Sequence, residues 1–183
     1  EKEILSFERS SDYSDHEILN DKYLILGSDK ESNTSRDYIV KVLELSSGNK
    51  IGVFGIRRPR ATSAPMLFSP DNKMFVTENE QHQIVLWEMS TGKETKNLSG
   101  HTDEVSSLSF LSKNMIVSTG MDGTTRLWDV TSGKEIAQFI SFTDGEWVVI
   151  TPDGYYNASI GGAKHLNVRI GNNVYSIDNY YET

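Results

Sequence analysis

The sequence predicts an all-β protein made of a repeated unit of about 40 residues. Three stretches end in the same glycine turn, VLELSSGNK, VLWEMSTGK and RLWDVTSGK, and they place Gly48, Gly92 and Gly133 44 and 41 residues apart. Between the turns lie short aromatic and β-branched segments bounded by Gly, Asn and Asp, which is typical of strands. No stretch of about twelve residues has apolar positions at helical spacing.

A second turn recurs in phase with the first. It reads LFSPDNK from Leu67, SFLSKNM from Ser109 and VITPDGY from Val149, each an apolar pair followed by turn residues. Proline sets φ at the first turn position, and Asp, Asn and Gly tolerate the conformations that follow, so these segments predict strand-to-strand turns. The strands expected around them include MFVT at 74–77, IVLW at 84–87, MIVST at 115–119 and TTRLW at 124–128.

Each unit therefore contributes four short antiparallel strands, with units at 1–49, 50–92, 93–133 and 134–183 in one domain over 1–183. A four-stranded unit cannot bury both of its faces alone, and units of this period stack around an axis as the blades of a β-propeller. The prediction is a propeller of four blades, with a meander or sandwich as the alternative. Its ring closes within one chain, forms part of a larger propeller, or is completed by self-association with a second copy. In a closed ring, residues 3–7 would pair with residues 173–177 of the last blade and remove two free edges.

Composition excludes several classes of protein. The 183 residues include 26 acidic and 18 basic side chains, for a net charge of −8, and no cysteine. Nucleic-acid affinity depends on neutralising phosphates, so no nucleic-acid partner is expected. Without cysteine there is no disulfide framework or cysteine zinc site. No run of about 18 apolar residues suggests a membrane partner, and charged residues at 1–9 replace the apolar part of a signal peptide, so a cytoplasmic protein is expected.

The third unit resembles a WD repeat. It has the pair Gly100-His101, then STGMDGTTRLWD from Ser118 to Asp129. The second unit keeps Trp87 but has Glu88 after it, the first has Leu43-Glu44, and the fourth lacks both the Trp and the Gly-His pair. The resemblance implies a buried hydrogen-bonded chain formed by His101, Ser118, Asp122 and Trp128.

The same chain contains the three residue types of a nucleophilic triad, Ser, His and Asp. Nothing near Ser118 resembles the sharp nucleophile turn of hydrolases. The structural network is therefore the preferred interpretation, and no catalytic residue is expected. The four histidines, His16, His82, His101 and His165, lie in different units without ligand spacing, and no glycine-rich phosphate loop opens a helix, so no metal or cofactor is expected either.

The carboxyl-terminal region, FTDGEWVVITPDGYYNAS from Phe142 and LNVRIGNNVYSIDNYYE from Leu166, resembles the closing segment of bacterial WD-repeat proteins. Some of those proteins continue into a caspase-like peptidase. The resemblance implies an alternative function, in which the propeller is the sensor or regulatory arm of a larger bacterial effector. This chain cannot itself be the peptidase, because a caspase-like enzyme needs a cysteine thiolate.

In WD-repeat proteins, the loops that lead into the inner strand of each blade line one rim of the ring and often hold partners. The resemblance places a rim at Arg57, Arg58 and Arg60, at Asp103 and Glu104, and at Glu146 and Trp147. Arginine binds carboxylates and phosphates through two hydrogen bonds, so an acidic or phosphorylated protein or peptide is the expected partner. The alternatives are a solvated charged loop and, for Trp147, core packing. The expected function is a non-catalytic platform for protein interaction.

Overall fold

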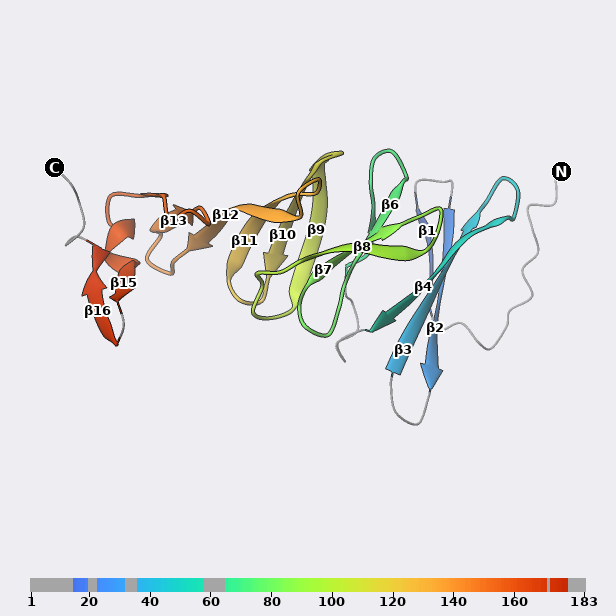
Figure 1. The fold of residues 1–183 in the computed structure, drawn as a ribbon, viewed down its shortest axis with the longest axis horizontal. Helices are drawn as coiled ribbons and strands as arrows, with labels where there is room; N and C mark the ends of the chain where they lie inside the picture. The colour runs from blue at the N-terminus through green and yellow to red at the C-terminus, as the bar shows by residue number, and fades with distance from the viewer. Residues whose placement is uncertain (1–14, 20–22, 32–35, 58–64, 171, 178–183) are drawn as a thin grey trace. The chain divides into compact units, whose positions relative to one another are not determined.

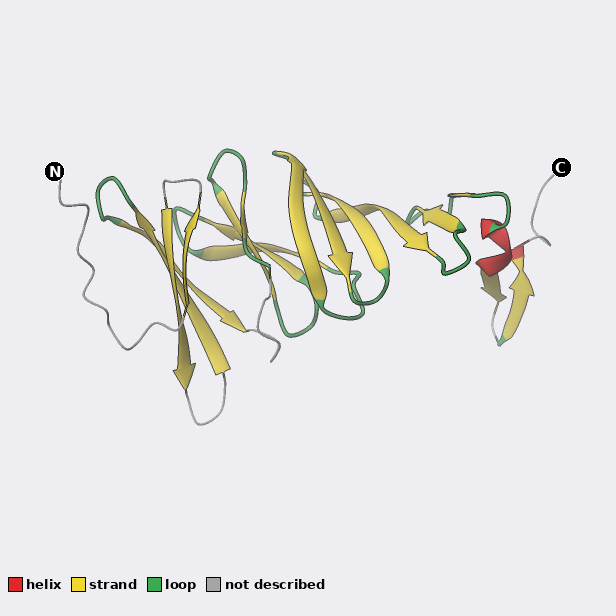
Figure 2. Cartoon of the chain, turned by 180° about the vertical axis from the view of Figure 1, so that it is seen from behind, coloured by secondary structure: helices red, strands yellow, loops and turns green. Residues whose placement is uncertain are grey.

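The structure, a computed structural model, describes residues 15–19, 23–31, 36–57, 65–170 and 172–177. These residues form sixteen strands and one short 3-10 helix, and every pair of hydrogen-bonded strands is antiparallel (Figures 1 and 2). The predicted all-β fold is confirmed. The chain divides into two compact units, residues 1–100 and 101–183. Among the described residues, no helix has the length and apolar character needed to cross a bilayer.

The first unit contains two four-stranded sheets, each ordered as its strands follow in the chain. The first sheet consists of β1 (Asp15–Leu19), β2 (Tyr23–Glu31), β3 (Arg36–Glu44) and β4 (Lys50–Arg57). The second consists of β5 (Leu67–Phe68), β6 (Met74–Glu78), β7 (Ile84–Glu88) and β8 (Lys93–Leu98).

The repeated glycine joins the third and fourth strands of a sheet. Gly48, Gly92 and Gly133 have φ of 69°, 67° and 74°, a left-handed conformation that glycine adopts without steric cost. The N–H of Gly48 donates to the Glu44 carbonyl at 2.7 Å, and the other two glycines repeat this bond at 2.8 Å. The strand after each glycine pairs with the strand before it, so both belong to the same sheet. Each sheet therefore ends with the first strand of the following sequence unit, where the units are 1–49, 50–92, 93–133 and 134–183.

The core of the first unit lies between its two sheets. Tyr23, Ile25, Val40, Val42 and Phe54 of the first sheet form one buried cluster with residues of the second sheet and its flanking turn, namely Phe68, Phe75 and Met89. The ring centroids of Phe54 and Phe75 are 4.9 Å apart, and those of Phe68 and Phe75 are 5.0 Å apart. Face-to-face packing of two four-stranded sheets is how adjacent propeller blades cover each other.

The second unit begins with the same four-stranded pattern, in β9 (Val105–Ser112), β10 (Met115–Gly120), β11 (Thr124–Asp129) and β12 (Lys134–Ser141). Its sheet then continues through β13 (Trp147–Ile150) and β14 (Tyr156–Ala158). The 3-10 helix η1 (Gly162–His165) leads to the pair β15 (Asn167–Ile170) and β16 (Asn173–Ser176).

The last four strands thus differ from the four-stranded pattern of the preceding sheets. The cause is a tight turn between β12 and β13, in which the Phe142 N–H donates to the Glu146 carbonyl at 2.9 Å and Gly145 has φ of 85°. This turn makes β12 and β13 a hairpin, so β13 pairs with β12. The strand expected at residues 3–7 lies outside the described residues, and in the described part of the chain β16 pairs with β15.

Candidate functional site

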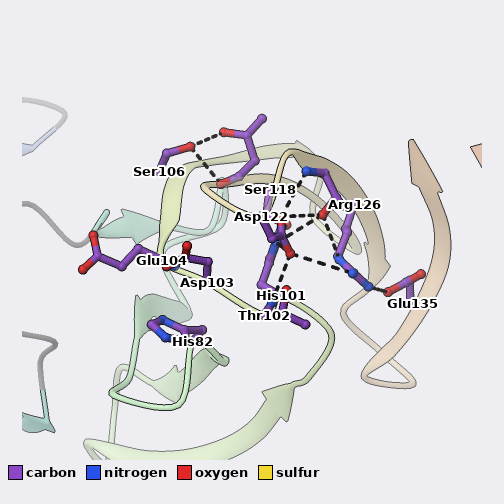
Figure 3. Close-up of polar contacts among 12 residues, drawn as sticks. His82, His101, Thr102, Asp103, Glu104, Ser106, Ser118, Asp122, Arg126 and Glu135 are labelled. Carbon is purple, nitrogen blue, oxygen red and sulfur yellow. Dashed lines mark hydrogen bonds and ion pairs between the residues drawn. The ribbon is translucent and has the colours of Figure 1, made fainter. Parts of the chain in front are cut away.

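The structure brings His101, Ser118, Asp122 and Trp128 together in a chain of hydrogen bonds within the second unit. His101 precedes β9, Ser118 lies on β10, Asp122 lies in the β10–β11 turn, and Trp128 lies on β11. The His101 Nε2 atom is 2.7 Å from Ser118 Oγ, and its Nδ1 atom is 3.0 Å from Asp122 Oδ2. The Trp128 indole N–H donates to Ser118 Oγ at 2.8 Å. Figure 3 shows His101, Ser118 and Asp122 close together, with dashed lines marking their polar contacts.

The direction of these bonds follows from the donors each group carries. Indole can only donate and a carboxylate can only accept. The Ser118 oxygen accepts from Trp128, its hydroxyl donates to His101 Nε2, and His101 Nδ1–H donates to Asp122. Ser118 is only 1% exposed, so its oxygen is enclosed by the groups it bonds and offers no approach for a substrate. This geometry is that of a structural network.

Asp122 connects two loops at one end of the sheet. Its carboxylate accepts the Thr102 N–H at 3.1 Å, the Thr124 N–H at 3.0 Å and the Thr124 hydroxyl at 2.8 Å. Burial raises the pKa of Asp122, but the bonds from Thr124, Thr102 and His101 outweigh it and bring the pKa down to about 2. A Cβ on Gly120 would collide with the His101 ring, so the turn needs glycine there.

Sequence reasoning missed three residues that extend the network. Arg126, 8% exposed, donates from Nε to Thr124 Oγ1 at 3.1 Å, and its guanidinium bonds the carboxylate of Glu135 on β12. Thr124 and Arg126 are four and two residues before Trp128 on the same strand, so alternation puts all three side chains on one face of the sheet. This even spacing could have identified Thr124 and Arg126 from the sequence. Glu135 had no such signal, because it lies opposite Trp128 only as a result of a register shift between Leu127 and Trp128.

The second sheet carries part of the same arrangement. The Trp87 indole N–H donates to Thr77 Oγ1 at 2.8 Å, with the same separation of ten residues as Trp128 and Ser118. His82 has φ of 59°, in the turn position that corresponds to Gly123. Its Nδ1 atom is 3.2 Å from an oxygen of the buried Glu78. The indole-to-hydroxyl bond is therefore a repeated feature of these sheets.

The arginine part of the predicted rim is described only at Arg57, the last residue of β4, where its backbone lies opposite Asp37. Arg58 and Arg60 lie outside the described residues. Asp103 is exposed and Glu104 half-buried in the loop before β9. The Glu104 N–H donates to Asp103 Oδ1 at 2.8 Å, and the Glu104 carbonyl accepts the Met121 N–H at 2.8 Å. This loop is thus joined to the β10–β11 turn by its backbone as well as by Asp122.

Glu146 and Trp147 lie at the start of β13 and differ in their roles. The Glu146 carboxylate accepts the Ser159 hydroxyl and the Gly161 N–H, the latter at 3.0 Å, so it fastens the segment after β14. Trp147 is 41% exposed, and its carbonyl accepts the Ser159 N–H at 3.1 Å. Its side chain is therefore available at the surface of the second unit and is not buried in a core.

The β12–β13 turn is also fixed to η1. Asp144 accepts hydrogen bonds from Lys164 at 3.1 Å and from His165 at 3.0 Å, and the Phe142 ring stacks on His165 with centroids 3.9 Å apart. The bond from Lys164, aided by the Glu146 N–H and His165, lowers the pKa of Asp144 to about 2. The described residues hold no group of three or more His, Asp or Glu side chains placed to share a metal ion.

Comparison with known proteins gives a family match for part of the chain. Residues 92–129 match the WD40 family model described as "WD domain, G-beta repeat", which spans the whole His101–Trp128 network. The chain is 26% identical over 113 residues to "Pre-mRNA-processing factor 19 homolog 2" of Arabidopsis thaliana, a match covering 62% of this chain and 21% of that protein. The chain spans between 10% and 21% of the length of the first curated relatives it matches. This relative is eukaryotic, and the resemblance to bacterial proteins stays a prediction.

Solved structures give the fold. "Crystal structure of RRP9 WD40 repeats" is similar with a TM-score of 0.52 and 18% identity, over 79% of this chain and 49% of that one. "Crystal structure of the computationally designed Ika4 protein" is similar with a TM-score of 0.51 and 20% identity, over 87% of this chain and 98% of that one. The chain therefore has the all-β fold of WD40 propeller structures, and its third repeat matches the WD40 family.

Proposed function

We propose that this protein is a non-catalytic platform that holds a protein or peptide partner on the loops leading into the first strands of its sheets. The observation that carries the proposal is the fixed geometry of the loop before β9. Asp122 binds this loop at Thr102, and the Met121 N–H binds it at Glu104, so its backbone is held before any partner arrives. A preformed loop loses little conformational freedom on binding, which leaves more of the contact energy for affinity.

An enclosed Ser118 supports a platform over a hydrolase. A nucleophile must reach its substrate, whereas this hydroxyl is buried under the indole and imidazole it bonds. The WD40 match over residues 92–129 supports the same choice, because this is the segment that carries the network and the fixed loop.

The proposed partner is an acidic or phosphorylated segment bound at Arg57, Arg58 and Arg60. Trp147, at the start of β13, is proposed as a separate apolar anchor for a partner on the second unit. The test measures fluorescence anisotropy of labelled acidic peptides, each with and without phosphoserine, against the wild-type chain and the double variant Arg57→Glu/Arg58→Glu. The variant should bind at least about tenfold more weakly, because charge reversal replaces bidentate attraction with repulsion. Lys113→Glu, a single charge reversal in the exposed β9–β10 turn, is the control and should bind as wild type.

Equal binding by the double variant and wild type would contradict the arginine site. Binding of a basic peptide in place of the acidic ones would indicate that the partner binds at Asp103 and Glu104. Loss of that binding in Asp103→Lys would then identify these residues as the binding site.

A second candidate is a regulatory arm of a larger cytoplasmic effector, such as a caspase-like peptidase. It is favoured by the small share of its relatives' length that the chain spans, since the matching segments there belong to much longer proteins. The test is the mass of the native gene product by immunoblot or intact mass spectrometry. A product with a further domain supports this candidate, and a product of the same mass as this chain rules it out.

Association of two copies into one ring is part of the platform proposal.

A further inference from the structure

We infer that the Asp153–Gly154 pair, in the turn between β13 and β14, is a site of covalent self-modification at which aspartate isomerises to isoaspartate. The sequence contains three Asp-Gly pairs, at 122–123, 144–145 and 153–154. Each pair lies in a turn between two paired strands of the second unit. The three turns share their backbone geometry and differ in what holds the carboxylate, and this difference assigns the reaction to Asp153.

The reaction requires only the chain and water. The Gly154 nitrogen attacks Cγ of Asp153 and forms a C–N bond, while the carboxyl OH leaves with the amide proton as water. The product is a five-membered succinimide ring. Water then adds to one of its two carbonyl carbons, and opening at the former backbone carbonyl leaves the chain running through Cγ, as isoaspartate. Glycine favours the first step because it has no Cβ to obstruct the attacking nitrogen.

Backbone geometry does not distinguish the three pairs. Their glycines have φ of 76°, 85° and 87° in chain order. Each glycine N–H donates to the carbonyl three residues earlier, at 3.1, 3.1 and 2.9 Å, which is the bond that closes a β-turn. A Cβ placed on any of these glycines would meet no atom within 4 Å, so the space around each nitrogen is open.

The carboxylate of Asp122 is restrained and enclosed. It accepts the Thr102 N–H, the Thr124 N–H and hydroxyl, and a bond from His101, and it is 5% exposed. During the attack one carboxyl oxygen must take up a proton and leave. An oxygen that already accepts hydrogen bonds does so only after its donors are displaced, so the network slows the reaction at Asp122.

Asp144 shows that exposure alone does not decide the outcome. Its side chain is 38% exposed, yet its Oδ2 atom is 3.1 Å from Lys164 Nζ and 3.0 Å from His165 Nε2. Its Oδ1 atom accepts the Glu146 N–H at 3.2 Å. Both oxygens are therefore occupied, and Asp144 is held in its turn although solvent reaches it.

Hydrogen bonding also keeps these two carboxyl groups ionised. Despite the opposing effect of burial, it brings the pKa of Asp122 and of Asp144 to about 2. At pH 5 only about one in a thousand of each group is then protonated. The protonated carboxyl is the more reactive form, because it can release its oxygen as water.

Asp153 lacks these restraints. It is exposed, and the next two residues are exposed as well, with Tyr155 at 77%. Among the described residues, no donor forms a hydrogen bond or ion pair with the Asp153 carboxylate. The side chain is free to turn toward the Gly154 nitrogen, so ring closure breaks no side-chain contact.

Isoaspartate at this position would weaken the β13–β14 hairpin. It inserts an additional carbon into the backbone of a turn that is closed by the Thr151 N–H, which donates to the Tyr155 carbonyl at 2.8 Å. Strand β14 lies at the edge of its sheet and pairs with β13 at three positions. Loss of the turn geometry therefore loosens an edge strand of the second unit.

The test compares the three pairs within one molecule. Wild-type protein is incubated for several weeks at pH 5 and at pH 7, below its unfolding temperature, and is then cleaved after glutamate. Cleavage at Glu104, Glu135, Glu146 and Glu182 puts the pairs into separate peptides, 105–135, 136–146 and 147–182. Chromatography and fragment-ion mass spectrometry locate the isoaspartate. We expect it to form at least about tenfold faster at 153 than at 122 or 144, because only those two must first lose hydrogen bonds.

A second measurement uses the intact protein. An isoaspartyl methyltransferase transfers a labelled methyl group to the free α-carboxylate that isomerisation creates. Asp153→Glu keeps the charge but would have to close a slower six-membered ring, so the aged variant should lose most of the label. Asp144→Glu is the matched control, with the same change in the β12–β13 turn, and should keep the label. Circular dichroism checks that both variants fold.

A third variant tests the restraint directly. Lys164→Met combined with His165→Leu removes two of the three bonds to Asp144 and keeps apolar contact with the Phe142 ring. Isomerisation at Asp144 should then rise at least about fivefold.

Three outcomes overturn the inference. Equal rates at the three pairs, or no isoaspartate at 153, would show that the free carboxylate confers no reactivity. Full labelling of aged Asp153→Glu would place the modification elsewhere in the chain. An unchanged rate at Asp144 in the double variant would show that hydrogen bonds do not protect it. None of these results bears on peptide binding at the rim, which is tested separately.

Discussion

Removing the Asp122 carboxylate should destabilise the second unit strongly and in a pH-dependent way. Four donors bond this group: the Thr102 N–H, the Thr124 N–H, the Thr124 hydroxyl and the His101 Nδ1–H. In Asp122→Ala they lose their acceptor in a site where the carboxylate is 5% exposed. At about 1 kcal/mol for each bond, the expected loss at pH 7 is about 3–4 kcal/mol in the free energy of unfolding.

The sign of the pH dependence follows from the lowered pKa. The folded-state pKa of Asp122 is about 2, below the usual aspartate value of 3.8, so its ionised form stabilises the fold above pH 3.8. A difference of roughly 1.8 units corresponds to about 2.4 kcal/mol, most of which is lost as the pH falls from about 5 to 2. The stability difference between wild type and Asp122→Ala should therefore shrink by about 2 kcal/mol over that range.

The assay is urea denaturation of both proteins at constant ionic strength from pH 7 to pH 2.5. Asp103→Ala is the matched control, because it removes an exposed carboxylate from the adjoining loop, where it accepts the N–H of its neighbour Glu104. It should change stability by less than about 0.5 kcal/mol. A loss below about 1 kcal/mol in Asp122→Ala at pH 7, or a difference that stays constant with pH, would refute the role assigned to this carboxylate.

Two further changes test the turns and the network by thermal and urea unfolding. Trp128→Phe keeps most of the buried ring but removes the N–H that Ser118 accepts, and should cost about 2 kcal/mol; recovery of full stability would show that this bond is dispensable. Gly92→Ala should cost clearly more than Gly123→Ala, about 3 against about 1 kcal/mol, since both have positive φ but only at Gly92 does an added Cβ meet the Val53 carbonyl, at 2.8 Å. Equal losses would mean that backbone strain alone sets the cost.

Much of the fold could be predicted from short-range patterns. Gly48, Gly92 and Gly133 have the positive φ that favours glycine in their hairpins. The glycine that recurs at this place in each repeat therefore predicted the turns. The resemblance to a WD repeat likewise identified Ser118 and Trp128, whose side chains meet across two neighbouring strands. Such pairs are separated by one hairpin, so their register follows from the turn.

Features that depend on long-range pairing could not be predicted. The sequence marked Glu146 as a rim residue, and the structure uses it to bind Ser159 and Gly161. It placed Trp147 on the same rim, with core packing as the alternative, and the side chain is exposed. Neither outcome has a local signature, because each depends on which distant segment lies beside the residue.

By itself, the sequence determined the all-β class, the repeat and the turns, and its resemblance to a WD repeat identified His101, Ser118, Asp122 and Trp128, since all of these depend on contacts within one repeat. The tertiary structure decided which faces are covered. Phe54 and Phe139 are the same residue type at the same repeat position, yet one is buried between two sheets and the other is exposed. Burial of a sheet face depends on the neighbouring sheet, and only the three-dimensional arrangement shows that β13 joins the edge of the β9–β12 sheet instead of covering its face.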